Sequence, residues 1–201
     1  MTATVRRGGP ADLDRAFGVW RAAEEVRRGG PASPEHGGCV RGHMQNPTAF
    51  LFVAEGQEGI SGMAVGMPGL ADDGAGPPVE GLCHVGAVFV APGRWGEGLG
   101  GRLVDAVLSE ARSRGYGRAQ LWTHADNTRA HRLYGRRGFR RTGREKEDDL
   151  GETIVHYERV LQTRAADLGP GRPIHERPHG DGFRPARGAG QVTNPTTRRR
   201  G

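Results

Sequence analysis

The residues best suited to chemistry lie in a glycine-dense turn, PGRWGEGLGG, at residues 92–101. An apolar, strand-like run, AVFV, precedes it, and apolar residues recur at helical spacing after it. The first amides of a helix have no intrahelical partner and lie at the positive end of its dipole, so this order of elements builds an anion site. Glycines let the backbone approach a phosphate closely, and Arg94 adds a cation at the rim. The alternative is a helix start where glycine serves packing alone, since such turns are weak signals by themselves.

Two better-known nucleotide-binding patterns do not fit this turn. No Gly-Lys-Ser/Thr follows, which excludes a P-loop. A dinucleotide fingerprint would come early in the chain, with an acidic residue some 20 positions later. Here the turn comes late, after segments that we predict to be antiparallel strands.

The elements that must position the turn follow from apolar periodicity and from helix and turn signals. We expect strands at residues 3–6, 49–56, 59–67, 82–91 and 118–124, another beginning in GFRRTG at 138–143, and a last one at 152–161. We expect helices from the N-cap Asp12 to about Val26, from Ser33 to His43 or Met44, over Gly98–Arg114 and over Thr128–Arg137. A polar loop is expected at 68–78. This order predicts an α/β fold, a mixed sheet with helices on both faces.

Composition narrows the class of protein. Charged residues make up 26% of the 201 residues and hydrophobic ones 35%, with a mean hydropathy of −0.62. No apolar run approaches the length of a membrane span, and the N-terminus lacks the apolar core of a signal peptide. Cys39 and Cys83 are too few for a disulfide framework. We therefore expect a cytoplasmic protein that does not contact membranes.

The net charge of +6 comes mostly from the C-terminal end. Residues 163–201 contain eight arginines and three acidic residues, and are rich in glycine and proline. Such a composition predicts a disordered tail after a domain at 1–162. Binding of nucleic acid by this tail is a hypothesis that we rank last, because Gly/Pro/Arg-rich ends of such arginine-biased sequences are often functionally silent.

Two segments together resemble a known family. VFVAPGRWGEGLGGRLVDAVLSEA resembles the acetyl-CoA-binding motif of the GNAT (GCN5-related) N-acetyltransferases, and NTRAHRLYGRRGFRRTG resembles their second signature. The likeness covers roughly residues 3–161. It implies a GNAT-like central, mostly antiparallel, twisted sheet flanked by helices on both faces. It also implies acetyl-CoA as cosubstrate.

By this resemblance, backbone groups of the central strand would bind the pantetheine arm and polarise the thioester carbonyl, and the amides of the turn would hold the pyrophosphate. The family usually has Gln or Arg where this chain has Trp95. Whether the side chain at this position contributes to phosphate binding is therefore left open. Asn127 would bind the cofactor arm, cap the next helix, or do both. The implied cosubstrate-binding residues are Val88, Phe89, Val90, Arg94, Trp95, Gly96, Glu97, Gly98, Leu99, Gly100, Gly101 and Asn127.

Three residues are candidates for catalysis. Tyr134 matches the family tyrosine that protonates the departing thiolate, although a core tyrosine is the alternative. The acceptor amine must be neutral to attack, and His84 is our first choice of base because period-2 alternation places it on the same strand face as Val88. Glu80 shares that face and would act through water. An ordinary buried histidine is the alternative for His84.

The family resemblance predicts an N-acetyltransferase that acts on a small-molecule or protein amine by direct attack through a tetrahedral intermediate. A catalytically silent acyl-CoA-binding regulatory module is the alternative. Trp20, Glu24 and the 27–38 loop occupy the region of the acceptor in relatives, although Glu24 and Glu25 are equally typical of a solvated helix face. Histidine spacing predicts no metal site. Homodimers are frequent among relatives, but the sequence identifies neither the oligomeric state nor the acceptor.

Overall fold

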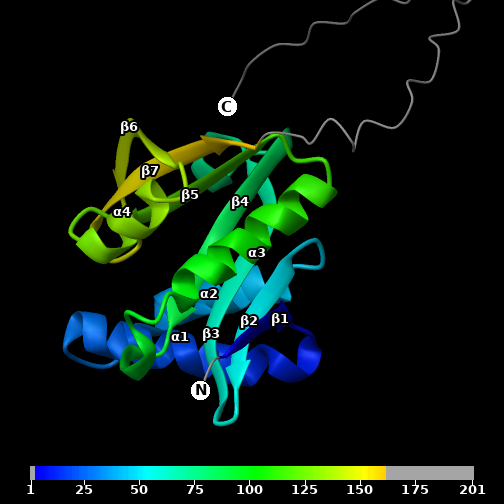
Figure 1. Ribbon diagram of the computed structural model, residues 1–201. Helices are drawn as coiled ribbons and strands as arrows, with labels where there is room; N and C mark the ends of the chain where they lie inside the picture. The colour runs from blue at the N-terminus through cyan, green and yellow to red at the C-terminus, as the bar shows by residue number, and fades with distance from the viewer. Residues whose placement is uncertain (1–2, 162–201) are drawn as a thin grey trace, which may run out of the picture. The chain divides into compact units, whose positions relative to one another are not determined.

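The computed structural model describes residues 3–161, which form a seven-stranded sheet in the order β1-β2-β3-β4-β5-β7-β6 (Figure 1). The strands are β1 (Thr4–Arg7), β2 (Phe50–Gly56), β3 (Gly59–Leu70), β4 (Pro78–Val90), β5 (Arg118–His124), β6 (Arg140–Glu147) and β7 (Thr153–Val160). All neighbouring strands are antiparallel except β4 and β5, which are parallel. The predicted mixed, mostly antiparallel sheet is confirmed. The predicted 163–201 tail lies outside the described residues.

Helices cover both faces of the sheet, as predicted. They are α1 (Leu13–Arg28), α2 (Pro34–Gln45), α3 (Leu99–Ser113) and α4 (Thr128–Gly135), with short 3-10 turns at η1 (Pro10–Asp12), η2 (Asp72–Gly74) and η3 (Pro92–Arg94). Among residues 3–161, no helix is both long enough and apolar enough to cross a bilayer. The side chains of β3 alternate between two cores: Met63 and Val65 pack with Trp20 of α1, and Ala64 packs with Leu103 of α3.

The helix starts show which local signals acted as predicted. Ser33 caps α2, because its hydroxyl accepts a hydrogen bond from the His36 backbone amide at 3.3 Å. Asp12 occupies the N-cap position of α1, as predicted, but its side chain makes no capping hydrogen bond to that helix. Its carboxylate instead accepts from the Gly9 amide at 2.8 Å and from Arg6.

The loop expected at 68–78 is shorter than predicted. β3 continues to Leu70 and β4 already begins at Pro78, so that only η2 and its flanks connect them. The polar composition of this stretch suggested a loop, but Leu70 pairs with Pro78 at the end of the hairpin. Pairing between β3 and β4, rather than local composition, thus determines where this loop begins and ends.

The two parallel strands diverge soon after they meet. β4 pairs with β5 only from Leu82 to His84, opposite Arg118 to Gln120. Beyond this point the rest of β4 pairs only with β3, and β5 continues along β7. The sheet therefore opens between β4 and β5, on the side where β4 leads into the glycine-rich turn (Figure 1).

Candidate active site

A cavity of about 1330 Å³ occupies the opening between the diverging strands. It is lined by β4, the turn before α3, the start of α3, β5, α4, one side of α2, the end of α1 and the β6–β7 connection. Each predicted cosubstrate-binding residue lines it except Glu97. The cavity thus joins the two sequence motifs, which are separated in the chain by residues 112–126, a stretch that includes the strand β5.

The turn provides uncapped amides for an anion. Gly96 and Gly98 have φ angles of 92° and 76°, in the left-handed region that favours glycine, and a Cβ added at either would meet nothing within 4 Å. Gly98 precedes α3 without any side-chain cap, so the amides of the first helical turn remain available to a ligand. The residues therefore fit a pyrophosphate group.

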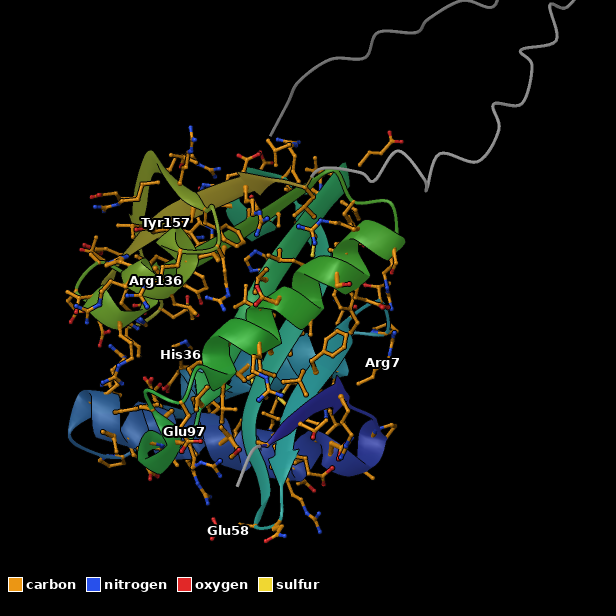
Figure 2. The ribbon with its side chains drawn as sticks, viewed as in Figure 1. Arg7, His36, Glu58, Glu97, Arg136 and Tyr157 are labelled. Atoms are coloured by element: carbon orange, nitrogen blue, oxygen red, sulfur yellow. The ribbon has the colours of Figure 1, made fainter. Side chains whose placement is uncertain are left out.

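Arg94 and Glu97 form an ion pair across the turn. Arg94 Nε donates to Glu97 Oε1 at 2.6 Å, and Arg94 holds the pKa of the exposed Glu97 carboxyl below its usual range. Figure 2 shows Glu97 at the turn, and it does not line the cavity. Glu97 thus orients the Arg94 side chain, and its carboxylate lowers the positive charge that Arg94 offers to an anion.

Trp95, the residue that departs from the family pattern, has a structural role in the turn. Its indole Nε1 donates to the Val90 carbonyl at 2.7 Å and so ties the turn to the end of β4. The guanidinium of Arg129, in the first turn of α4, lies 4.1 Å from the centre of the Trp95 ring. Local spacing in the sequence does not predict this role of Arg129, because the contact joins residues 34 positions apart.

The second motif supplies Asn127 and Tyr134. Asn127 Oδ1 accepts from the Ala130 amide at 3.0 Å and caps α4, which leaves its side-chain nitrogen to donate elsewhere. Tyr134 is 7% exposed and packs against Phe139 and Tyr157, with ring centres 5.8 and 6.3 Å away. Burial raises the pKa of the Tyr134 phenol above its ordinary value. Tyr134 is thus a protonated residue that is both part of the core and part of the cavity lining.

The prediction that His84 and Val88 share a strand face is wrong. Val65 pairs with Ala87 and Gly66 with Val85, so Gly86 is an extra residue in β4 that forms a β-bulge. Val85 and Val88 both pack against the α3 core, which places His84 on the opposite face, paired with Met67. A bulge reverses the period-2 alternation, and sequence periodicity cannot show it.

His84 nevertheless lines the cavity, whereas Glu80 does not. Burial is the main cause that lowers the pKa of His84 to about 3, and the nearby His43, His156 and Lys146 lower it further. The Nδ1 atom of His84 is buried without a hydrogen-bond partner among residues 3–161. Glu80 is exposed, and a left-handed Gly81 follows it, so that alternation does not carry from Glu80 to His84.

The acceptor side of the cavity differs from the expected solvated helix face. Glu24 is 1% exposed, and its Oε1 lies 2.9 Å from Arg27 and 3.5 Å from Nδ1 of His36. Burial alone would raise the pKa of Glu24, but His36 and Arg27 outweigh it and lower the value to about 2. Figure 2 shows His36 between the α1–α2 layer and the part of the fold that contains α4. Trp20 is a core residue, and Glu25 is exposed.

The structure also brings His124 together with Asp148 and Glu152, which lie 24 and 28 positions later in the sequence. His124 Nε2 lies 3.2 Å from an oxygen of each carboxylate. Arg27 and Arg28 contact the Glu152 carboxylate at 2.7 and 3.1 Å, so arginines already supply positive charge to this cluster. Of the three residues, His124 and Asp148 line the cavity.

Comparison with known proteins identifies the family. The model of the Acetyltransferase (GNAT) family matches residues 19–139, and the chain belongs to that family. The resemblance predicted from the two motifs is thus confirmed, and with it acetyl-CoA as the cosubstrate. No curated protein sequence matches the chain.

Solved structures share the fold at low sequence identity. The ribosomal-protein-S18-alanine N-acetyltransferase from Escherichia coli is 18% identical, with a TM-score of 0.62 over 83% of this chain and 99% of that one. YncA from Salmonella typhimurium, a structure described with acetyl-CoA, is 19% identical, with a TM-score of 0.61 over 85% and 99%. PaiA N-acetyltransferase from Thermoplasma acidophilum, described in complex with coenzyme A, is 14% identical, with a TM-score of 0.56 over 78% and 98%.

Proposed function

We propose that this protein is an N-acetyltransferase that transfers the acetyl group of acetyl-CoA to a primary amine by direct attack. The observation that carries the proposal is the single cavity that contains both the uncapped start of α3 and Tyr134. An anion site alone would suit many ligands. A buried, protonated phenol in the same cavity adds the proton donor that a departing thiolate needs.

The chain's own groups have defined tasks in this proposal. Amides from Gly96 to Gly101 bind the pyrophosphate. Backbone groups of Val88 to Val90, in the part of β4 that has separated from β5, bind the pantetheine arm. A backbone amide of β4 polarises the thioester carbonyl and stabilises the oxyanion. Tyr134 gives its proton to the sulfur as the carbon–sulfur bond breaks, and Asn127 orients the arm.

The charges around the cavity support a cationic amine as acceptor. Arginines of the turn and α4 line the cosubstrate end, and Arg129, Arg132 and Arg136 are among them. Asp148 and Asp149 of the β6–β7 connection line the other side, where Glu24 is already paired with Arg27. An ammonium group is favoured beside carboxylates, and a polyphosphate beside guanidinium groups. Two free thiols, Cys39 and Cys83, support a cytoplasmic location.

A thiol-release assay with acetyl-CoA and a panel of amines tests the proposal. We expect amine-dependent release of CoA, with kcat about 10²–10⁴-fold lower in Tyr134→Phe. Tyr116→Phe is the matched control, because Tyr116 is a half-buried tyrosine that does not line the cavity. CoA binding without release for any amine would favour the acyl-CoA-binding module, and no CoA binding would contradict the assignment of the cavity.

A further inference from the structure

Helix α2 presents one face to the cavity. His36, Cys39, His43 and Asn46 all line it, at spacings of three and four residues that place them along one side of a helix. Cys39 and His43 are in contact there, with Cys39 Sγ 3.8 Å from His43 Nε2. The chemistry that this face of α2 can perform therefore depends on the protonation state of the His43 ring.

The hydrogen bond on the other side of the ring determines which nitrogen of His43 carries the proton. His43 Nδ1 lies 3.2 Å from the carbonyl oxygen of Gly86. A carbonyl only accepts hydrogen bonds, so Nδ1 donates, and in the neutral ring Nε2 has the lone pair. The thiol of Cys39, a weak donor, is the group beside that lone pair.

The close approach of His43 depends on the bulge in β4. A Cβ added to Gly86 would lie 2.9 Å from His43 Nδ1, so only glycine leaves room for the ring. Gly86 is also the residue at which β4 departs from regular pairing, two positions before the segment proposed to bind the pantetheine arm. His43 therefore lies beside the part of the cavity where the thioester would be attacked.

Burial is the main reason that the neutral form of His43 is favoured. Burial lowers its pKa below 6.5, the Gly86 carbonyl opposes this, and His36 lowers it further. From β4, the His84 ring faces His43 with centres 6.0 Å apart, and His84 in turn is close to His156 and Lys146. Burial lowers the pKa of His84 to about 3, whereas at His43 the hydrogen bond to the Gly86 carbonyl opposes burial, so His43 is the better placed proton acceptor.

We propose that Nε2 of His43 is the base that takes the proton from the acceptor amine, an inference that rests on the proposed function. The acceptor's ammonium group replaces the Cys39 thiol beside Nε2 and gives up one proton to it. The amine nitrogen then forms a bond to the thioester carbon and loses its second proton to solvent, and the carbon–sulfur bond breaks. The thiolate takes a proton from Tyr134, and solvent restores both residues, with one proton released overall for each amide formed.

Cys39 itself is not assigned as the nucleophile. Burial, and next the carboxylate of Asp149, raise the pKa of its thiol above the ordinary value. A thiol must lose its proton to attack a thioester, and these neighbours favour the protonated form. We therefore expect transfer without an acetyl-cysteine intermediate.

Nitrogen NMR of the full chain with labelled histidines tests the tautomer directly. We expect one histidine at pH 7 with its proton on Nδ1 whose signal disappears in His43→Asn. Asn is chosen because its side-chain amide can still donate to the Gly86 carbonyl while Nε2 is absent. A proton on Nε2 of His43 would contradict the proposal, whatever the activity of the enzyme.

The pH profile of thiol release tests the role in catalysis. In the wild type kcat/KM should fall as the pH decreases through the pKa of His43, and in His43→Asn this limb should disappear with a rate about 10²–10⁴-fold lower. CoA affinity, measured by calorimetry, should not change in His43→Asn. The kcat/KM of Cys39→Ala should stay within a few-fold of the wild-type value.

If the wild type is active and His43→Asn keeps the same rate, the role of His43 is contradicted but the proposed function is not. Equal losses in Cys39→Ala would point to the thiol instead. No turnover by the wild type would contradict the proposed function itself and the base with it.

Discussion

At the scale of single residues, the turn before α3 shows how an unusual side chain is accommodated. Trp95 holds the end of β4 through Val90 and supports Arg129 on its ring. Arg94 supplies a cation within the turn, and α4 adds Arg129 as a second one. The position of this second cation depends on a contact between two motifs.

Substitution of Trp95 should separate these two effects. Trp95→Phe removes the hydrogen bond to Val90 but keeps an aromatic ring, and should weaken CoA binding about five-fold, which corresponds to ~1 kcal/mol. Trp95→Ala also removes the support for Arg129 and should weaken it further. Calorimetric titration with CoA measures the affinity of both variants. The Arg129→Gln variant shows how much the charge of Arg129 contributes to that affinity. Wild-type affinity in Trp95→Ala would contradict this account.

The buried Glu24 should make stability depend on pH. Its pKa of about 2 is below the unfolded value, so its contribution is present above pH 4.5 and is lost as the pH falls toward 2. Glu24→Gln should lower the free energy of unfolding at pH 7 by about 2 kcal/mol, because Arg27 loses a buried charged partner. Urea unfolding at pH 7 and pH 3 measures this. Glu25→Gln is the exposed control, and an equal loss at both pH values would contradict the assignment.

At the scale of elements, one inserted residue in β4 reorganises the site. The bulge at Gly86 moves His84 to the α2 side, makes room for His43, and lies two positions after His84, the last residue of β4 that pairs with β5. A regular strand would have placed His84 and Val88 on one face, as predicted. The cavity therefore arises from a local departure from regular pairing.

Gly86→Ala tests the bulge, because a Cβ there would lie 2.9 Å from both His43 Nδ1 and Met67 Cε. The Met67 end can move, so we expect a loss of only about 1 kcal/mol in stability. Displacement of His43 should lower kcat far more than this. Gly38→Ala on α2, where an added Cβ meets nothing within 4 Å, should instead stabilise the chain by about 1 kcal/mol. Thermal unfolding and thiol release measure both variants; an unchanged kcat in Gly86→Ala would be evidence against the contact.

At the scale of the whole molecule, the boundary at 1–162 remains a prediction. The described part ends in a well-packed segment: Leu161 is 2% exposed, and its amide donates to the Gly117 carbonyl at 2.8 Å. The domain therefore needs the chain through Leu161 to complete its core.

Two truncations locate the boundary. A chain of residues 1–162 should keep the midpoint of thermal unfolding and the CoA affinity of the full chain. A chain of residues 1–160 loses the buried Leu161 side chain and should be about 2 kcal/mol less stable. A large loss of stability in the longer truncation would show that residues 163–201 contribute to the fold. Gel filtration of both chains also tests whether the protein forms a homodimer.

The sequence by itself determined the family, most of the elements and the residues of the two motifs. These depend on local features: the glycines of 96–101, the Ser33 cap of α2, and apolar periodicity along α3. Tertiary structure alone decided the bulge at Gly86, the contact of His43 with its carbonyl, and the burial of Glu24. The physical reason is that strand register and pairing between distant side chains depend on how whole elements pack, and their partners lie too far along the chain for local spacing to show.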